Sequence, residues 1–257
     1  MNREPRNQMM TGLLALLALA TLSPQVPAAE DASAIVEGSL DHMRGAASRG
    51  TAEMTVHRPE WERTMTMQIW TLGRSDSLVR ITGPAKDAGN ATLKKGHDMW
   101  MFNPKINRLI KLPPSMMSQG WMGSDFSNND LAKTDSIAED YEHTIESTAV
   151  IDDKKVYTIV SRPKPGAAVV WGMLRLEIRE DHVLLSETFY DESDKPVKKM
   201  VNTDIRRFGD RLLPATWTIS KSDAKDEYTV FHYEDLQFLE ILPERLFTQS
   251  NLRNPGR

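Results

Sequence analysis

The sequence predicts a mainly β fold in which a long antiparallel sheet curls into a barrel or a sandwich. Between residues 51 and 236, apolar and polar residues alternate in short runs, which is the period of a half-buried strand. Turn residues such as Gly96-His97-Asp98 separate these runs. A hydrophobic content of 40% in 257 residues is enough for a core, and no repeat or linker divides residues 31–252. We therefore expect one domain over residues 29–257.

The first 28 residues have the three parts of a secretory signal peptide. Arg3 and Arg6 give a positive start, the apolar run 11–22 follows, and small residues end at Ala28. This run is shorter than the roughly 20 apolar residues that span a bilayer, and an N-terminal membrane anchor is the alternative. We expect cleavage near Ala28 and a soluble periplasmic protein. Because the chain has no cysteine, we expect no lipid anchor at a cysteine.

Helical spacing is confined to three places. Residues 32–44 repeat apolar side chains at the period of a helix, Asp31 is placed to cap its start, and Gly45 follows as a stop. Short helices are expected at 129–135 and 243–252.

The other periodic segments predict strands, and we expect a sheet of about eleven strands from them. Turn residues mark the boundaries, as in Arg58-Pro59-Glu60, Gly83-Pro84, Asn103-Pro104 and Asp152-Asp153. The segments are 51–57, 61–72, 77–82, 91–95, 99–102, 107–112, 142–151, 155–162, 172–179, 183–190, 197–208, 215–220 and 227–236.

Several strands are apolar on both faces, so both faces require cover. Residues 99–102, for example, are four consecutive large apolar residues. Either helices and loops close an ordinary core over the sheet, or its inner face forms an apolar cavity. Eight of the 14 methionines lie between residues 54 and 122, and methionine adapts to varied apolar partners. This distribution favours the cavity.

The segment 115–135 breaks the strand pattern. Its apolar residues stand among glycine, serine and asparagine, and long loops of this kind are commonly functional. We expect either a lid or docking tip, or a loop whose apolar side chains enter the core. These side chains are Met116, Met117, Trp121, Met122 and Phe126.

Signatures of catalysis, metal binding and nucleic-acid binding are weak. The six histidines form no H-E-x-x-H motif or metal-spaced pair, and no Gly-rich phosphate loop follows a strand. The formal charge of −4 gives no electrostatic footprint for nucleic acid. We expect no metal, no cofactor and no nucleic-acid partner. A lipid esterase would need Ser124 with His97 or His143, and there is no G-x-S-x-G elbow.

The segment 96–104 resembles the G-x-x-x-W-x-F/Y-x-P hairpin of the LolA-like family of bacterial outer-membrane lipoprotein carriers. Leu109, Leu112-Pro113 and Gly123-Ser124-Asp125-Phe126 look like the branch of outer-membrane lipoprotein-sorting proteins, as does the tail from Leu242-Pro243 to Leu252. The resemblance implies an unclosed antiparallel β-barrel whose open concave face is covered by helices. It also implies a cavity for acyl chains and an arginine near the lid, for which Arg74 is the best match and Arg80 the second.

The leading hypothesis is a non-catalytic periplasmic carrier of lipid or lipoprotein acyl chains. The resemblance implies loading at an inner-membrane transporter of the RND/MMPL or ABC type and unloading at an outer-membrane acceptor. An envelope sensor that binds lipid or mislocalised lipoprotein is the alternative, and a lipid esterase is a third. The residues expected to line the acyl cavity are Met54, Met65, Met67, Ile69, Trp70, Trp100, Phe102, Leu109 and Met173.

Overall fold

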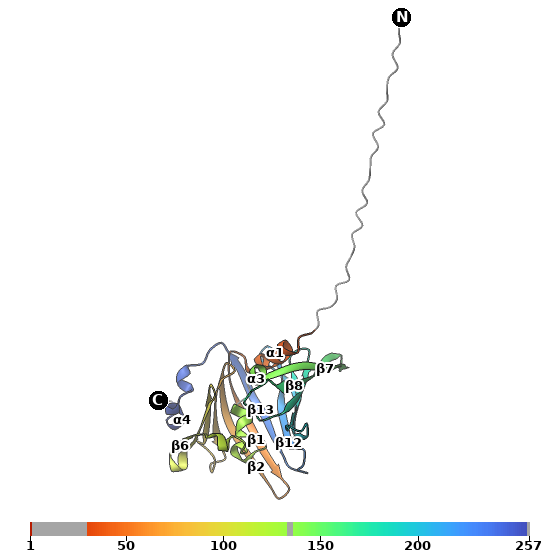
Figure 1. The fold of residues 1–257 in the computed structure, drawn as a ribbon. Helices are drawn as coiled ribbons and strands as arrows, with labels where there is room; N and C mark the ends of the chain where they lie inside the picture. The colour runs from red at the N-terminus through yellow and green to blue at the C-terminus, as the bar shows by residue number, and fades with distance from the viewer. Residues whose placement is uncertain (2–29, 133–135, 256–257) are drawn as a thin grey trace. The chain divides into compact units, whose positions relative to one another are not determined.

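One antiparallel sheet of thirteen strands forms most of the fold, in the order β6-β5-β4-β3-β2-β1-β13-β12-β11-β10-β9-β8-β7 (Figure 1). The computed structural model describes residues 1, 30–132 and 136–255, so the predicted signal peptide falls outside the described residues except for Met1. The strands are β1 (Ala47–Arg58), β2 (Trp61–Leu72), β3 (Asp76–Gly83), β4 (Ala91–Lys95), β5 (Asp98–Asn103), β6 (Arg108–Lys111), β7 (Tyr141–Ile151), β8 (Lys154–Pro163), β9 (Met173–Arg179), β10 (Leu184–Tyr190), β11 (Pro196–Phe208), β12 (Arg211–Lys221) and β13 (Tyr228–Leu239).

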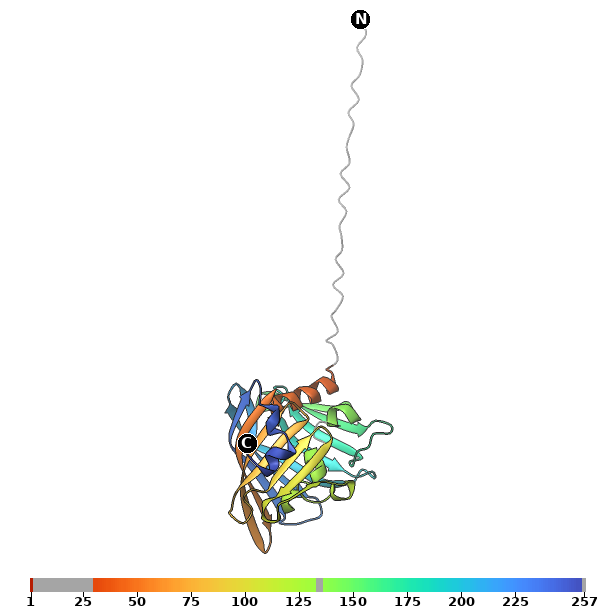
Figure 2. The same ribbon diagram turned by 90° about the vertical axis from the view of Figure 1, so that its left-hand side faces the viewer.

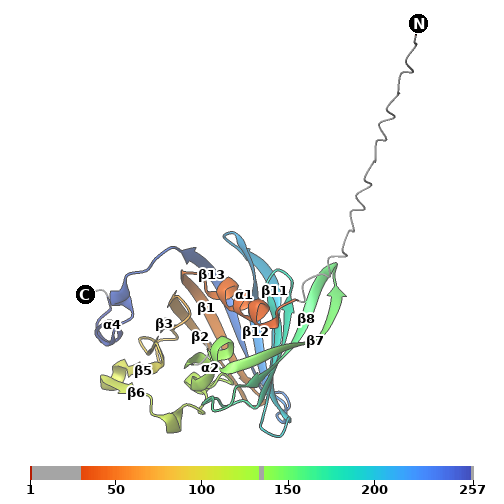
Figure 3. The ribbon, with the colours of Figure 1, turned by 45° about the horizontal axis from the view of Figure 1, so that its top comes forward.

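The sheet consists of two meanders, β1 to β6 and β7 to β13, which join where β1 pairs with β13. Its two outermost strands, β6 and β7, stay at opposite edges, so the barrel is not closed. In Figure 3 the sheet curves around α1 and α2, which lie on its concave side. The predicted fold class is confirmed. The strand number is higher than about eleven because each of the thirteen predicted segments forms its own strand.

The first helix, α1 (Ala32–Arg44), has the predicted bounds. The Asp31 side chain accepts a hydrogen bond from the backbone N–H of Ser33 at 2.9 Å, and Gly45 takes a φ of 61° at the end. A left-handed φ is what glycine adopts at low cost, which explains why the helix stops there.

The C-terminal helix is shorter than expected, and the helix predicted at 129–135 falls partly outside the described residues. The segment 129–135 contributes α2 (Asn128–Ala132), and α3 (Ser136–Asp140) follows, with residues 133–135 outside the description. The C-terminal segment, residues 240–255, forms a 3₁₀ turn (Glu244–Leu246) and α4 (Gln249–Arg253). No helix in the described ranges is long and apolar enough to cross a membrane.

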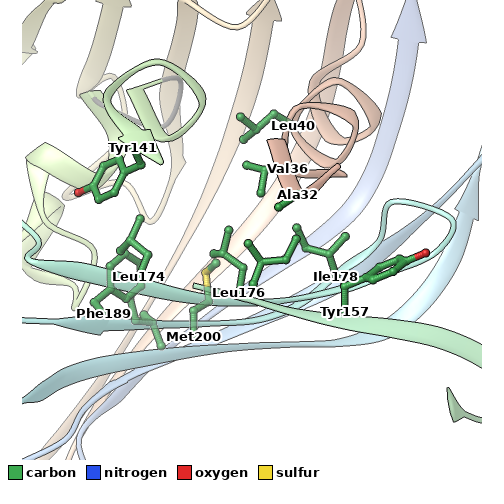
Figure 4. Close-up of a cluster of buried hydrophobic side chains, with 12 residues drawn as sticks. Ala32, Val36, Leu40, Tyr141, Tyr157, Leu174, Leu176, Ile178, Phe189 and Met200 are labelled. Atoms are coloured by element: carbon green, nitrogen blue, oxygen red, sulfur yellow. The ribbon is translucent and has the colours of Figure 1, made fainter. Parts of the chain in front are cut away.

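The concave face carries two adjoining hydrophobic clusters. In the first, α1 packs on strands of the second meander, and Figure 4 shows Val36 and Leu40 directed toward Leu176 and its neighbours. The second lies over the first meander and contains Met54, Met65 and Trp121, and we call it the concave cluster. The segment 113–132 is therefore packed onto the sheet beside α1.

A third cluster, which we call the convex cluster, covers the opposite face of the first meander. Here the C-terminal segment packs across β3 to β6, and Figure 2 shows α4 lying over these strands. Phe247 and Leu252 are fully buried in this cluster. The strands that are apolar on both faces are thus covered from both sides, by the segment 113–132 and by the C-terminal segment.

Candidate functional site: an apolar cavity under a lid

A cavity of about 240 Å³ lies between the concave face of the sheet, α1 and the segment 113–132. Its sheet wall is mainly apolar and comes from both meanders. Its opposite side is formed by the end of α1, by α2 and α3, and by residues 169–171. The apolar lining residues are Leu40, Met43, Met67, Ile69, Val79, Trp121, Phe126, Leu131, Ile137, Tyr141, Val169, Val170, Trp171, Leu174, Leu184, Phe189, Met200, Trp217, Ile219, Phe231, Tyr233 and Leu236.

The predicted acyl-cavity residues divide between the two faces of the sheet. Met67 and Ile69 line the cavity, and Met54 and Met65 are buried in the same concave cluster beside it. Met173 lies on β9, out of phase with the inward-facing Leu174 and Leu176. The remaining four pack in the convex cluster under the C-terminal segment, and they are Trp70, Trp100, Phe102 and Leu109.

All eight methionines between residues 54 and 122 meet in the concave cluster. Met54, Met65 and Met67 come from β1 and β2, and two more come from β5. The other three come from the segment 113–132, so methionines of this segment and of the sheet belong to the same cluster. These flexible side chains allow repacking at low cost. The methionines from β5 and from the segment 113–132 are Met99, Met101, Met116, Met117 and Met122.

The segment 113–132 closes one side of the cavity, and we call it the lid. Trp121 and Phe126 line the cavity, and the indole Nε1 of Trp121 donates to Thr92 Oγ1 at 2.9 Å. Met116, Met117 and Met122 pack against the concave cluster and are absent from the lining. The predicted lid residues are therefore brought together by the structure, with the two aromatic residues facing the cavity.

A buried carboxylate fastens the lid to the sheet. The side chain of Asp125 is 0% exposed and accepts from Arg58 Nη2 at 3.0 Å and Nη1 at 3.1 Å. Thr229 Oγ1 donates to Asp125 Oδ2 at 2.7 Å and accepts from the Asp125 backbone N–H at 3.0 Å. Arg58 is the last residue of β1 and Thr229 is the second residue of β13, so these bonds fix the lid to the strand pair that joins the two meanders.

A second set of buried polar side chains, Asp130, Lys198 and Glu187, lies where α2 of the lid meets β10 and β11. Asp130 of α2 forms a short ion pair with Lys198 of β11, whose ammonium lies 4.5 Å from the ring centre of Phe189. Glu187 of β10 lines the cavity nearby and is 6% exposed. Its burial, reinforced by the negative charge of Asp130 and opposed by Lys198, raises the pKa of Glu187 to about 8.

Glu187, Lys198 and Asp130 are not among the site residues predicted from the sequence. Strand alternation could have identified two of them. Glu187 lies on the same face of β10 as Phe189, and Lys198 lies on the same face of β11 as Met200. A charged residue in phase with core residues marks a buried polar position. The rest of the wall from the second meander, including Trp217 and Phe231, also lies outside the predicted set.

The two candidate lid arginines have different positions. The guanidinium of Arg74, in the β2–β3 turn, donates to both carboxylate oxygens of Asp41 on α1, at 2.6 and 2.5 Å. This hydrogen bonding holds the pKa of Asp41 below its usual value. Arg74 thus ties α1 to the sheet and does not line the cavity. The arginine that lines the cavity is Arg44. Arg80 donates to the carbonyls of Asn251 and Leu252 in α4.

The esterase grouping is not assembled. The Ser124 hydroxyl donates to the Trp121 carbonyl at 2.7 Å, whereas His143 Nδ1 lies 2.7 Å from Ser161 Oγ and His97 is exposed in the β4–β5 turn. Within the described ranges, no group of three or more His, Asp or Glu side chains is placed to hold a metal ion.

A family model described as "Uncharacterized protein"-like matches residues 73–254, more than half of the chain. The chain belongs to this family. The matched residues of the family cover the lid, most of the cavity wall and the C-terminal segment. Among curated proteins, none matches the sequence significantly.

Three crystal structures share the fold over almost the whole described chain. A domain described as an outer membrane lipoprotein-sorting protein from Vibrio parahaemolyticus has a TM-score of 0.76 at 19% identity, covering 87% of this chain and 98% of that chain. A DUF1329 family protein from Desulfovibrio piger gives 0.76 at 20% identity, with coverage of 87% and 100%. A LolA superfamily protein from Nitrosomonas europaea gives 0.72 at 23% identity, with coverage of 86% and 99%. The chain therefore shares its fold with these three proteins.

Proposed function

We propose that this protein is a non-catalytic carrier that holds the acyl part of a lipid or lipoprotein in the cavity under the lid. The observation that carries this proposal is the apolar cavity itself, which is lined by both meanders and roofed by a separate segment. Residues 29–257 act as one lipid-binding domain in this proposal, because the sheet is continuous from β6 to β7.

The size and composition of the cavity support an acyl ligand. Its volume of about 240 Å³ lies between the ~150 Å³ of an engineered apolar cavity that takes up benzene and the ~300–1,000 Å³ of drug-sized sites. Each methylene that leaves water contributes about 0.8 kcal/mol. A carrier must also release its ligand, and the cluster to which methionines of both lid and sheet belong provides a boundary that repacks as the lid moves.

The carrier works between two membranes in this proposal. The protein is exported to the periplasm, with cleavage near Ala28, loads at an inner-membrane transporter of the RND/MMPL or ABC type and unloads at an outer-membrane acceptor. The resemblance of residues 96–104 to the LolA-like hairpin supports this. So does the shared fold with a domain described as a lipoprotein-sorting protein.

A cavity-filling substitution tests the proposal directly. Ile69 lines the cavity from β2, whereas Gln68 beside it is exposed on the other face. We expect protein purified from its host to carry a lipid in native mass spectrometry. Ile69→Trp should lose that lipid and the ability to move a fluorescent acyl lipid between vesicles, because the indole occupies the acyl site. Gln68→Trp is the matched control and should keep both. Ligand-free wild type without transfer, or normal transfer by Ile69→Trp, would contradict the proposal.

A further inference from the structure

Two neighbouring polar side chains, Glu187 and Asn202, lie in the mainly apolar sheet wall of the cavity. Glu187 on β10 faces Leu176 of β9 on one side and Met200 of β11 on the other. Asn202 follows Met200 by two residues and shares its face, so Glu187 and Asn202 are diagonal neighbours about 7–8 Å apart at their Cα atoms. Both line the cavity, and each is only 6% exposed.

These two side chains carry buried oxygen atoms that lack hydrogen-bond partners. In the part of the chain that the structure describes, Glu187 Oε1 and Asn202 Oδ1 make no hydrogen bond. The Asn202 Nδ2 group donates to the Leu184 carbonyl at 3.0 Å, which fixes the amide orientation and leaves Oδ1 as an acceptor. Burying such atoms without partners is costly, so their presence in a cavity wall indicates a group that pairs with them.

The charges around this position favour a neutral partner. Lys198 is paired with Asp130, so these two charges offset each other. Burial raises the pKa of Glu187 to about 8, so at neutral pH its carboxyl is mainly protonated and offers an O–H donor and a carbonyl acceptor. Among Glu187, Asp130 and Lys198, no positive charge is left over to pair with a ligand carboxylate or phosphate. Arg44, the other cation at the cavity, comes from the end of α1 and not from β10 or β11. A hydroxyl donates and accepts as the site requires.

We propose that Glu187 and Asn202 form a polar subsite inside the apolar cavity, which binds a hydroxyl group carried within an otherwise apolar lipid. This inference rests on the proposed carrier function and narrows its cargo to hydroxylated lipids. The hydroxyl donates to Asn202 Oδ1 and accepts a hydrogen bond from the O–H of the protonated Glu187 carboxyl. The apolar neighbours Met200, Trp217 and Ile219 contact the adjoining chain.

The test compares lipids that differ only in one hydroxyl. Methyl hexadecanoate and its 3-, 10- and 16-hydroxy forms would compete with cis-parinaric acid, whose fluorescence reports occupancy of an apolar cavity. At pH 7 we expect at least one hydroxy ester to bind wild type about five- to tenfold more tightly than the unsubstituted ester, the worth of one net hydrogen bond in a buried site. In Glu187→Met, which keeps only the Asn202 acceptor, this ratio should fall toward one.

Thr188→Val is the matched control, because Thr188 is the next residue on β10 and lies outside the cavity lining. It should keep both affinities and their ratio. Equal affinities of all four esters for wild type would overturn the subsite and leave the carrier proposal standing, as would an undiminished preference in Glu187→Met. Failure of every ester to bind wild type would overturn the carrier proposal itself. The comparison within wild type decides the question even where a variant does not fold.

Discussion

At the scale of single residues, Glu187 makes stability depend on pH. Its carboxyl has a folded-state pKa of about 8, against 4.5 in an exposed glutamate, with Asp130, Lys198 and Tyr141 as its charged or titratable neighbours. The folded protein therefore binds more protons than the unfolded chain between these pH values. Its contribution to the free energy of unfolding is fully present below pH 4.5 and is lost as pH rises to 8, by up to about 1.4 kcal/mol per pH unit.

Glu187→Gln should remove this dependence, because the amide stays neutral at every pH. Urea denaturation from pH 5 to pH 8 should give a flatter profile for the variant than for wild type, and at pH 8 the variant should be the more stable protein. Thr188→Val, on the outward side of the same strand, should keep the wild-type slope. A wild-type slope in Glu187→Gln would show that another group causes the dependence.

Asp125 is the second residue with a sharp expectation. Asp125→Asn removes the charge that faces Arg58 in a buried position, although Arg58 keeps the His57 carbonyl at 2.6 Å and Glu227 at 3.5 Å. We expect a loss of about 2–3 kcal/mol in the free energy of unfolding, measured with urea. Asp194→Asn is the control, because Arg162 and Asp194 form the same two-pronged pair while 55% and 54% exposed. Solvent screening should make its effect much smaller, and equal losses in the two variants would contradict this explanation.

At the scale of elements, the C-terminal segment acts as part of the core. Phe247 and Leu252 of this segment are fully buried in the convex cluster, on the face of the sheet opposite the cavity. Phe247→Ala should lower the free energy of unfolding by about 3–5 kcal/mol, as expected for a truncated buried aromatic residue. Ile241→Ala, at a side chain that is 77% exposed in the same segment, should change it little. Both variants should retain ester binding, and loss of binding in a folded Phe247→Ala protein would contradict the separation of the two faces.

The elements themselves were largely predictable, because alternation and turn chemistry are local signals. Helix α1 ends where Asp31 and Gly45 place its caps, and each of the predicted strand segments forms a strand. The facing of the strands was less accessible. Ile69 and Trp70 are both large and apolar, so the sequence alone does not say which one meets the cavity and which the C-terminal segment. That choice depends on contacts with residues far along the chain.

The buried polar residues of the site could not be predicted from the sequence, because their burial also depends on contacts with residues far along the chain. Lys198 is buried because Asp130, 68 residues earlier, returns to it from the lid. Asp125 is likewise buried by bonds to Arg58 and Thr229, 67 and 104 residues away. Strand periodicity shows that a charged residue faces inward. It does not show which distant residue pairs with that charge and offsets the cost of burying it.

At the scale of the whole molecule, the cavity joins the two meanders. Its wall takes Met67 and Ile69 from β2 and Phe189 and Met200 from β10 and β11, so one ligand contacts both halves of the sheet. A ligand that binds only the folded state stabilises by mass action, by about 2.7 kcal/mol at a concentration 100 times its dissociation constant. This stabilisation should appear in both halves at once, because neither can lose its part of the wall without releasing the ligand.

We therefore expect methyl hexadecanoate, or a hydroxy ester that binds better, to raise the urea midpoint of wild type. The shift should be the same by tryptophan fluorescence, by far-ultraviolet circular dichroism and by amide exchange of strands from each meander. Ile69→Trp fills the cavity and should show no shift, whereas Gln68→Trp should show the full one. Protection confined to one meander would mean that the ligand contacts only that half of the sheet. An equal shift in Ile69→Trp would place the ligand outside the cavity, because the added indole leaves no room for a chain between β2 and the lid.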